Sequence, residues 1–310
     1  MKNNISAPSR VWNDVLLPQP QKPFRRPSMT AAKIDAAPLA QPLALTSLAG
    51  KIAVVTGGTQ GLGEAIAREF AARGLTGLVI CGRNAENGKA VAASISAAGC
   101  KTLFVKAELG KVKECRAVIA KADKQFGRVD VLVNAAGLTD RGNIFDTTEE
   151  RFNEIFDVNV RAPFFLIQES VRIMKREKIQ GSIVNIQSMS ANGGQPFITA
   201  YCASKGALAT LTRNVAHSLL RYRIRVNGLN IGWMATPGED RIMKTYHDAK
   251  DGWLDEAVKT RPFGRLIDPK EVARACAYLA SAESGLMTGA NIDFDQTIVG
   301  VGDPPLDPAA

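Results

Sequence analysis

From residue 51 onward, short apolar runs alternate with longer stretches of helical periodicity. The β-branched apolar runs predict strands at 52–55, 78–81, 102–105, 129–133, 182–186, 224–226 and 291–294. The periodic stretches predict helices at 64–73, 86–98, 111–126, 149–177, 199–220 and 269–280. Strands that are apolar throughout and separated by helices are buried on both faces of a sheet. The sequence therefore predicts an α/β fold, with a doubly wound parallel sheet in a single domain.

The predicted domain covers residues 46–300, with an N-terminal extension over 1–45 and a C-terminal tail over 301–310. The extension is rich in proline and has few periodic apolar positions, so no packed core is expected there. We expect a largely irregular, flexible segment, with an arm that wraps a neighbouring subunit as the alternative. Asp14 and Asp35 argue against a transit peptide.

Charge and cysteine content narrow the expected partners. The net charge is +9, but the Lys and Arg residues are spread without a basic block. This argues against nucleic acid and favours a phosphorylated cofactor or an anionic substrate. No apolar run approaches the roughly 20 residues of a membrane span, so no membrane partner is expected. Five singly scattered cysteines indicate reduced thiols in a cytoplasmic protein, and no metal site is expected.

A glycine-rich turn, Thr56-Gly-Gly-Thr-Gln-Gly-Leu-Gly63, joins the first predicted strand to the first predicted helix. Glycine permits a tight turn and lets backbone N–H groups approach a pyrophosphate, while the helix directs its positive end at that charge. This context favours a Rossmann fold that binds a dinucleotide. The expected cofactor contacts are Gly57, Thr59, Gln60, Gly61, Leu62 and Gly63.

The end of the second predicted strand bears on the choice of cofactor. NAD-binding folds carry an acidic residue about 20 residues after the glycine turn, where it binds the ribose 2′-hydroxyl. Here the sequence is Cys81-Gly-Arg83-Asn84, with an arginine and no acid. A guanidinium pairs with a 2′-phosphate, so NADP is favoured, and NAD stays possible. An ordinary surface charge at Arg83 is the alternative.

Tyr201 and Lys205 lie four residues apart in the predicted helix 199–220, so their side chains share one face. A free tyrosine loses its proton only near about pH 10, and an adjacent ammonium favours the phenolate. The pair is therefore a candidate acid/base. On its own, the same spacing is also typical of a packed ring and a solvated ammonium.

Together these features resemble the short-chain dehydrogenase/reductase family over residues 48–297. The resemblance rests on the glycine turn, Asn134-Ala-Ala-Gly137, Asn159, Ser188, Tyr201 and Lys205, with Ser188 and Tyr201 thirteen residues apart. It implies an NAD(P)-dependent enzyme that transfers a hydride between the nicotinamide and an alcohol or ketone.

The resemblance also implies a role for each catalytic residue. Tyr201 would be the proton donor or acceptor at the reacting oxygen, and Ser188 would hydrogen-bond the same oxygen. Lys205 would lower the pKa of Tyr201 and hold the nicotinamide ribose. Asn159 would keep a water that links Lys205 to solvent as a proton relay. Further cofactor contacts are implied for Glu108, Leu109, Asn134, Ala135, Ala136, Gly137, Ile231, Gly232, Met234 and Thr236.

The sequence departs from the family pattern in three places. Ile231-Gly232 replaces the usual Pro-Gly, which leaves the rigidity of that turn in doubt. Glu108-Leu109 stands where an aspartate is usual. The segment 293–296, Asp-Phe-Asp-Gln, replaces an acid followed by two glycines, so an altered subunit contact or pocket wall is expected.

The stretch 236–268 is rich in charge and corresponds to the variable substrate lid of the family. Candidate substrate contacts around the pocket are Ser188, Ser190, Asn192, Gln195, Trp233 and His247, with Gln187 and Met234 beside them. These hydrogen-bonding side chains favour a sugar, a polyol or a related hydroxylated molecule. The two long helices at 149–177 and 199–220 indicate a homotetramer or homodimer.

Two alternatives stay open. A non-catalytic NADP-binding regulator or scaffold would share the fold, but such proteins typically lose the tyrosine or the lysine. Epimerisation or dehydration is typical of extended relatives, which carry a larger region after the sixth strand than this chain does.

Overall fold

The structure is a computed structural model, and it describes residues 46–301. The predicted extension at 1–45 and all of the predicted tail except Val301 lie outside the described residues.

Within residues 46–301, seven parallel strands form one sheet in the order β3-β2-β1-β4-β5-β6-β7. The strands are β1 (Ile52–Thr56), β2 (Gly77–Gly82), β3 (Lys101–Lys106), β4 (Val131–Asn134), β5 (Ser182–Ser188), β6 (Arg225–Ile231) and β7 (Asn291–Phe294). The strand order reverses between β1 and β4. In open α/β sheets, ligands bind at the carboxyl ends of the strands beside such a reversal.

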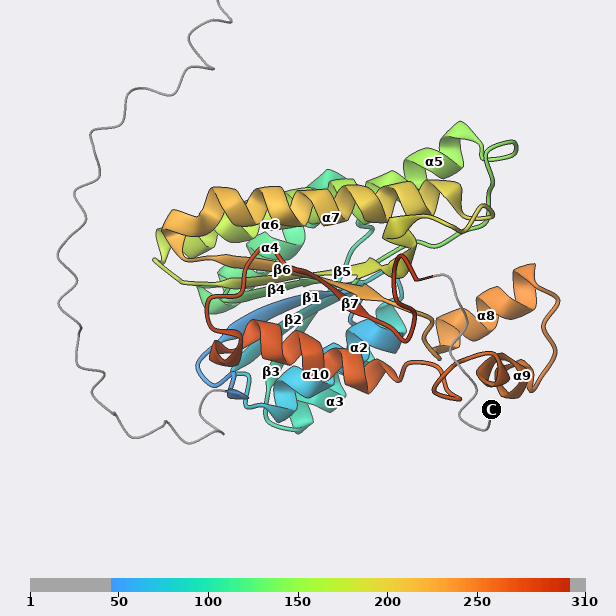
Figure 1. Ribbon diagram of the computed structural model, residues 1–310. Coiled ribbons are helices and arrows are strands. Elements are labelled where there is room, and N and C mark those ends of the chain that lie inside the picture. Colours follow the sequence, from blue (N-terminus) through green and yellow to red (C-terminus); the bar gives the residue numbers. More distant parts are fainter. Residues whose placement is uncertain (1–45, 302–310) are drawn as a thin grey trace, which may run out of the picture. The chain divides into compact units, whose positions relative to one another are not determined.

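Helices cover both faces of the sheet (Figure 1). One face carries α2 (Gly61–Ala72), α3 (Ala85–Ala97) and α10 (Pro269–Ala280). The other carries α4 (Val112–Phe126), α6 (Ala162–Arg176) and α7 (Thr199–Leu219). Each face has its own apolar core cluster, so the predicted doubly wound α/β fold is confirmed. No helix among the described residues is long and apolar enough to cross a membrane.

Two helical segments differ from the prediction. The predicted helix 149–177 is divided into α5 (Glu149–Phe156), a π-helical turn at Asp157–Arg161, and α6. The predicted lid is not only a loop, because it contains α8 (Pro237–Tyr246) and α9 (Trp253–Lys259). Both differences lie next to the site described below.

A row of hydrogen-bonded polar side chains runs through the buried sheet beneath α7. The Asn134 amide donates to Asn185 (2.8 Å), and Asn185 donates to the Thr212 hydroxyl (2.9 Å). The Gln187 amide reaches both Thr212 and Asn291, at 2.9 Å each. Buried hydrogen bonds of this kind fix one relative position for the groups they join. They therefore set how α7, which carries Tyr201 and Lys205, is placed on the sheet.

Candidate active site

Ser188 and Tyr201 are brought together at the carboxyl end of β5. Ser188 is the last residue of β5, and Tyr201 lies in the first turn of α7. The Tyr201 hydroxyl is hydrogen-bonded to the side chains of Ser188 and Thr139. The phenol is thus held at the sheet edge by two hydroxyl groups, one from Ser188 at the end of β5 and one from Thr139 in the loop after β4.

Lys205 is one turn further along α7 and is almost fully buried, with 4% of its surface exposed. Its ammonium donates to the Ile186 carbonyl (2.9 Å) and lies 5.6 Å from the centroid of the Tyr201 ring. Burial lowers the pKa of Lys205 to about 8. Among the described residues this is the one hydrogen bond of the ammonium, so two of its three N–H groups are left for a ligand.

Burial raises the pKa of Tyr201 above its ordinary value, and the hydrogen bonds with Ser188 and Thr139 only partly oppose this. The structure therefore differs from the expectation that Lys205 lowers this pKa. The reason is geometric, because the ammonium faces the ring and the Ile186 carbonyl. At neutral pH the phenol is protonated, which is the form that a proton donor needs.

Asn159 lies in the π-helical turn and is buried. Its amide group bonds the backbone of Leu138 in both directions, at 2.8 and 2.9 Å, and donates to Ser204 (3.0 Å). The side chain is therefore engaged with protein groups, and its amide oxygen keeps one lone pair. The expected water relay stays a prediction. It fastens the segment after β4 to α7, and π-helical turns are frequent at functional sites.

The glycine turn fits a pyrophosphate. Gly57 has φ 67°, and a Cβ there would lie 3.0 Å from the Ala136 backbone, so the turn packs directly on the Asn134–Gly137 segment. A Cβ on Gly63 would collide with the Gly57 carbonyl. The N-cap of α2, Gln60, makes no side-chain cap bond, so backbone N–H groups at this helix start are left for an anion.

The Thr56 hydroxyl joins the two cofactor segments. It accepts from the N–H groups of Ala135 and Ala136, both at 3.0 Å. Gly137 completes the segment, since a Cβ there would lie 3.5 Å from the Lys205 ammonium. The structure therefore brings the predicted turn 57–63, the predicted segment 134–137 and Lys205 together at one edge of the sheet.

Arg83 follows β2 and is exposed beside that edge. Asn84 accepts from the Asn87 N–H (3.0 Å) and caps α3. Lys111 pairs with Glu108 at 2.6 Å and lowers its pKa, to which Arg83 adds a weaker attraction. Arg83 is thus close to Glu108, while Leu109 is buried in the core.

Two tryptophans hold the lid together. The Trp233 indole donates to Glu239 and the Trp253 indole donates to Asp240, both at 2.8 Å. The two ring systems stack with centroids 5.9 Å apart. Trp233 was predicted to contact substrate, but its N–H group is engaged within the lid.

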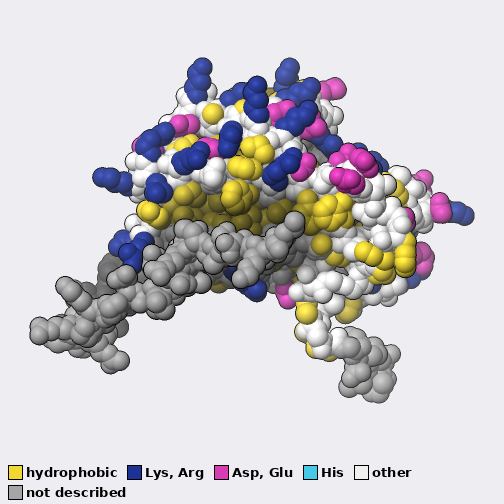
Figure 2. Space-filling view, turned by 90° about the horizontal axis from the view of Figure 1, so that it is seen from above, with side chains coloured by type: hydrophobic (Ala, Val, Ile, Leu, Met, Phe, Trp, Pro, Cys, Tyr) yellow, Lys and Arg dark blue, Asp and Glu magenta, His cyan; other side chains and the backbone are white. Residues whose placement is uncertain are grey.

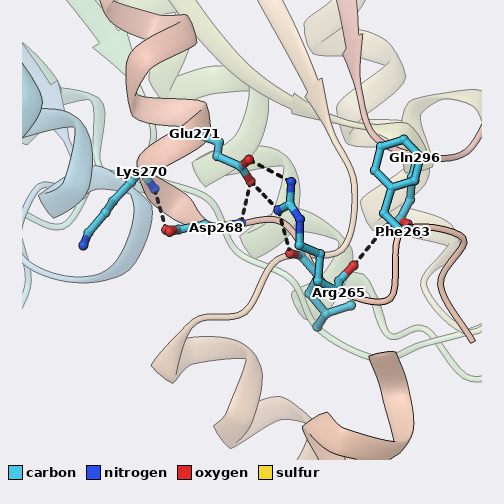
Figure 3. Close-up of polar contacts among 7 residues, drawn as sticks. Phe263, Arg265, Asp268, Lys270, Glu271 and Gln296 are labelled. Carbon is cyan, nitrogen blue, oxygen red and sulfur yellow. Dashed lines mark hydrogen bonds and ion pairs between the residues drawn. The ribbon is translucent and has the colours of Figure 1, made fainter. Parts of the chain in front are cut away.

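The end of the lid is fixed to the segment after β7 (Figure 3). The Gln296 side chain accepts from the Phe263 N–H and donates to the Arg265 carbonyl, both at 2.8 Å. Arg265 pairs with Glu271 through two bonds, at 2.7 and 2.9 Å. The neighbouring Asp295 packs against Gly232, where any Cβ would collide with the carboxylate.

The lid tip contacts the loop that follows β4. The Arg141 guanidinium donates to the His247 ring (3.0 Å) and lies over the rings of Phe197 and Tyr246, at 5.3 and 5.7 Å. The Tyr246 hydroxyl is hydrogen-bonded to Asp140, which raises the pKa of the phenol. His247 is thus hydrogen-bonded to Arg141, and its contact with substrate stays a prediction.

The other predicted substrate contacts are only partly gathered around Ser188. Ser188 donates to Ser190 (3.0 Å), and Ser190 donates to the Gln195 amide oxygen, so these predicted contacts are assembled. Gln187 is fully buried in the polar row and does not face substrate. Asn192 is exposed and lines a separate polar hollow beside α7.

Three further positions complete the comparison with the prediction. Met234 is buried in a core cluster, and the Thr236 hydroxyl caps α8 by accepting from the Glu239 N–H (3.1 Å). Ile231 is partly buried at the end of β6.

Sequence reasoning missed Thr139. The available signal was its place two residues after the Asn134–Gly137 segment, at the carboxyl end of a strand.

A nucleotide-binding turn and a set of serine, tyrosine and lysine side chains at one edge of a parallel sheet define an NAD(P)-dependent oxidoreductase. Residues 57–296 match the family model described as enoyl-(acyl carrier protein) reductase. The chain belongs to the short-chain dehydrogenase/reductase family.

Several relatives resemble the chain over most of its length. The NADP-dependent (R)-specific alcohol dehydrogenase of Lentilactobacillus kefiri is 34% identical over 251 residues, which cover 80% of this chain and 96% of that protein. Galactitol 2-dehydrogenase of Agrobacterium fabrum is 30% identical over 254 residues, covering 80% and 97%. A crystal structure of a gluconate 5-dehydrogenase from Burkholderia cenocepacia with NADP and tartrate has a TM-score of 0.74 and 29% identity, covering 82% of this chain and 97% of that chain.

Proposed function

We propose that the protein interconverts an alcohol and a ketone on a hydroxylated small molecule, such as a sugar, a polyol or a sugar acid, with NADP as the preferred cofactor. The observation that carries the proposal is the Tyr201 hydroxyl, bonded to Ser188 and Thr139 and one helical turn from the buried Lys205. The bound nicotinamide supplies or takes the hydride. The protein then needs to handle only the proton.

In this proposal each residue has a defined task. Tyr201 transfers the proton at the reacting oxygen, and in reduction its protonated phenol is the donor. Ser188 and Thr139 hold the phenol in position, and Ser188 stabilises the oxygen as charge develops. Lys205 offers its two free N–H groups to the nicotinamide ribose. Asn159 positions α7 through Ser204, and Ser204 in turn donates to the Tyr201 carbonyl (2.7 Å).

The substrate class is supported by the polar groups beside Ser188. Ser190 and Gln195 form a hydrogen-bonded pair there, and such a pair recognises hydroxyl groups rather than an acyl chain. The names of galactitol 2-dehydrogenase and gluconate 5-dehydrogenase point to the same kind of substrate. A regulator or scaffold is not favoured, because the side chains of a working site are all in place.

A substrate panel tests this assignment. We expect NADPH oxidation with ketoses and keto sugar acids to exceed that with unbranched aliphatic ketones of equal length by about 10-fold or more in kcat/KM. The reason is that Ser190 and the exposed Gln195 offer hydrogen bonds to substrate hydroxyl groups, which an aliphatic chain cannot make. NADPH absorbance measures the rates. Higher kcat/KM for the aliphatic ketones would contradict the substrate class while leaving the oxidoreductase assignment intact.

Arg83 carries the proposed preference for NADP. Arg83→Asp should weaken NADPH binding by about 10- to 100-fold and leave NADH binding equal or stronger, since a carboxylate repels the 2′-phosphate and accepts from a 2′-hydroxyl. Fluorescence titration with both cofactors measures the change. Lys89→Asp, on the exposed side of α3, is the matched control for a charge reversal. An unchanged ratio of the two affinities in Arg83→Asp would remove Arg83 from cofactor selection.

We also infer that the chain forms a homodimer or homotetramer through α5, α6 and α7. Figure 2 shows apolar side chains gathered over the face that carries α6 and α7. Phe152 and Phe164 are 43% and 46% exposed there, which is unusual for large aromatic side chains.

All five cysteines are free thiols, which supports a cytoplasmic location.

A further inference from the structure

A hollow of about 230 Å³ lies at the amino-terminal ends of β5 and β6. The segments that follow α6 and α7 line it, with Gln180 leading into β5 and Ile224 leading into β6. β5 runs from this end of the sheet to Ser188, a distance of about 20 Å for seven residues in extended conformation. The hollow is therefore separate from the site around Tyr201.

The hollow gathers positive charge that has no counter-charge. Four cations line it, namely Lys175, Lys178, Arg221 and Arg223, and no carboxylate does. Within residues 46–301, none of the four makes an ion pair. Glu177 is the acid nearest in sequence, but it is bound to Arg176 at 2.6 Å. Four like charges around one small space repel one another unless an anion joins them.

The ends of α6 and α7 do not need these side chains. Basic residues are common at helix C-termini, where they bond the last carbonyls and offset the helix dipole. Here backbone groups satisfy those carbonyls, through Ile179 N–H to Met174 O (2.8 Å) and Arg223 N–H to Leu220 O (3.0 Å). The four cationic side chains make no hydrogen bond to protein among the described residues. The Lys175 ammonium lies over the Tyr222 ring, 4.5 Å from its centroid, and the N–H groups of all four side chains are left for another partner.

Two of the cations also occupy left-handed backbone positions. Lys178 has φ 54° and Arg223 has φ 56°. Helix ends with this conformation favour glycine or asparagine, because a Cβ is strained there. The chain instead carries a cation at both positions, on the two sides of one hollow. The backbone conformation by itself therefore does not account for a cation at either position.

We propose that this hollow binds a multiply charged phosphate group of a small molecule, such as a pyrophosphate. Its volume of about 230 Å³ is that of about eight water molecules, which leaves room for two linked phosphates. Two guanidinium groups supply bidentate donors and two ammonium groups supply point charges. The Tyr222 hydroxyl and the Gln180 amide line the same space and add uncharged donors.

Calorimetric titration with inorganic pyrophosphate tests the proposal, using the full chain at low salt without divalent cations. NADP is present at one equivalent per chain, so that the glycine turn is filled without an excess that would compete for the hollow. We expect one pyrophosphate to bind per chain, and Lys178→Gly with Arg223→Gly to weaken binding by about 10-fold or more. Glycine suits both backbone positions, so the double variant should unfold at an equal or higher temperature than the wild type.

The double variant Lys89→Gln with Lys121→Gln is the matched control, because it removes the same charge from exposed helical positions elsewhere. It should bind pyrophosphate within about twofold of the wild type, the small change expected from long-range charge at low salt. No binding by the wild type, or equal losses in both double variants, would overturn the site. The same phosphate chemistry could come from a soluble molecule or from a lipid headgroup. Sedimentation with vesicles that contain phosphatidic acid distinguishes these two sources. Vesicle binding that needs Lys178 and Arg223, without pyrophosphate binding, would overturn the small-molecule assignment.

Discussion

Tyr201→Phe should bind NADPH as the wild type does and lose turnover by a factor of about 10² to 10⁴. The change removes one oxygen atom, and with it the only phenol that is bonded to both Ser188 and Thr139 among the described residues. The ring, its packing and the position of Lys205 stay the same. The loss should therefore appear in kcat, with little change in the affinity for cofactor.

Steady-state kinetics and a fluorescence titration on the same preparation separate these effects. Tyr278→Phe is the matched control, since this tyrosine lies in α10, away from the carboxyl ends of the strands. It should keep turnover within about twofold of the wild type, as substitutions remote from a site usually do. Near-normal turnover of Tyr201→Phe would show that the proton comes from another group.

Lys205→Met should abolish most activity and stabilise the protein at the same time. Turnover should fall by about 10² or more, because the side chain beside the phenol, which we propose also binds the ribose, is lost. Burial lowers the pKa of Lys205 from 10.5 to about 8, so the folded state holds this charge at a cost. Methionine removes that cost and loses the bond to Ile186. We expect a net gain of roughly 1–2 kcal/mol at neutral pH.

The pH dependence of stability separates this cause from others. Between about pH 8 and 10.5 the unfolded wild type binds more protons at this lysine than the folded one, so wild-type stability rises with pH there. The advantage of Lys205→Met should be full below pH 8 and shrink above it. Denaturant unfolding at pH 7 and pH 9.5 measures the difference in free energy of unfolding between Lys205→Met and the wild type at each pH. A gap that stays constant, or a less stable variant at pH 7, would contradict the assigned cost of burial.

The fold follows from the sequence because its elements have strong local signals. The β-branched run at 182–186 is apolar enough to require burial on both faces, and β5 covers it. The helix that carries Tyr201 was predicted at 199–220 and ends at Leu219 in the structure. The motif spacings also place Ser188, Tyr201 and Lys205 correctly, since strand and helix geometry convert each spacing into a position.

What could not be predicted depends on contacts between distant segments. The π-helical turn covers only five residues and contains no proline or glycine, so 149–177 reads as continuous. The lid helices are short and polar and depend on the stacking of Trp233 on Trp253. The raised pKa of Tyr201 reflects burial, which two residues four apart in sequence do not reveal. Thr139 reaches the phenol only through the path of the loop after β4.

The packing of Asp295 against Gly232 constrains the order in which substitutions at these two positions can accumulate. A side chain at 232 has no room while the carboxylate stands there, so Gly232 is fixed by a residue 63 positions away. Loss of the Asp295 side chain would remove this collision and leave room for a side chain at 232. A substitution at 232 is therefore tolerated only when the residue at 295 is small. A library that varies residue 232 alone would score it as intolerant, whereas a library that also varies residue 295 would recover combinations with a small residue there.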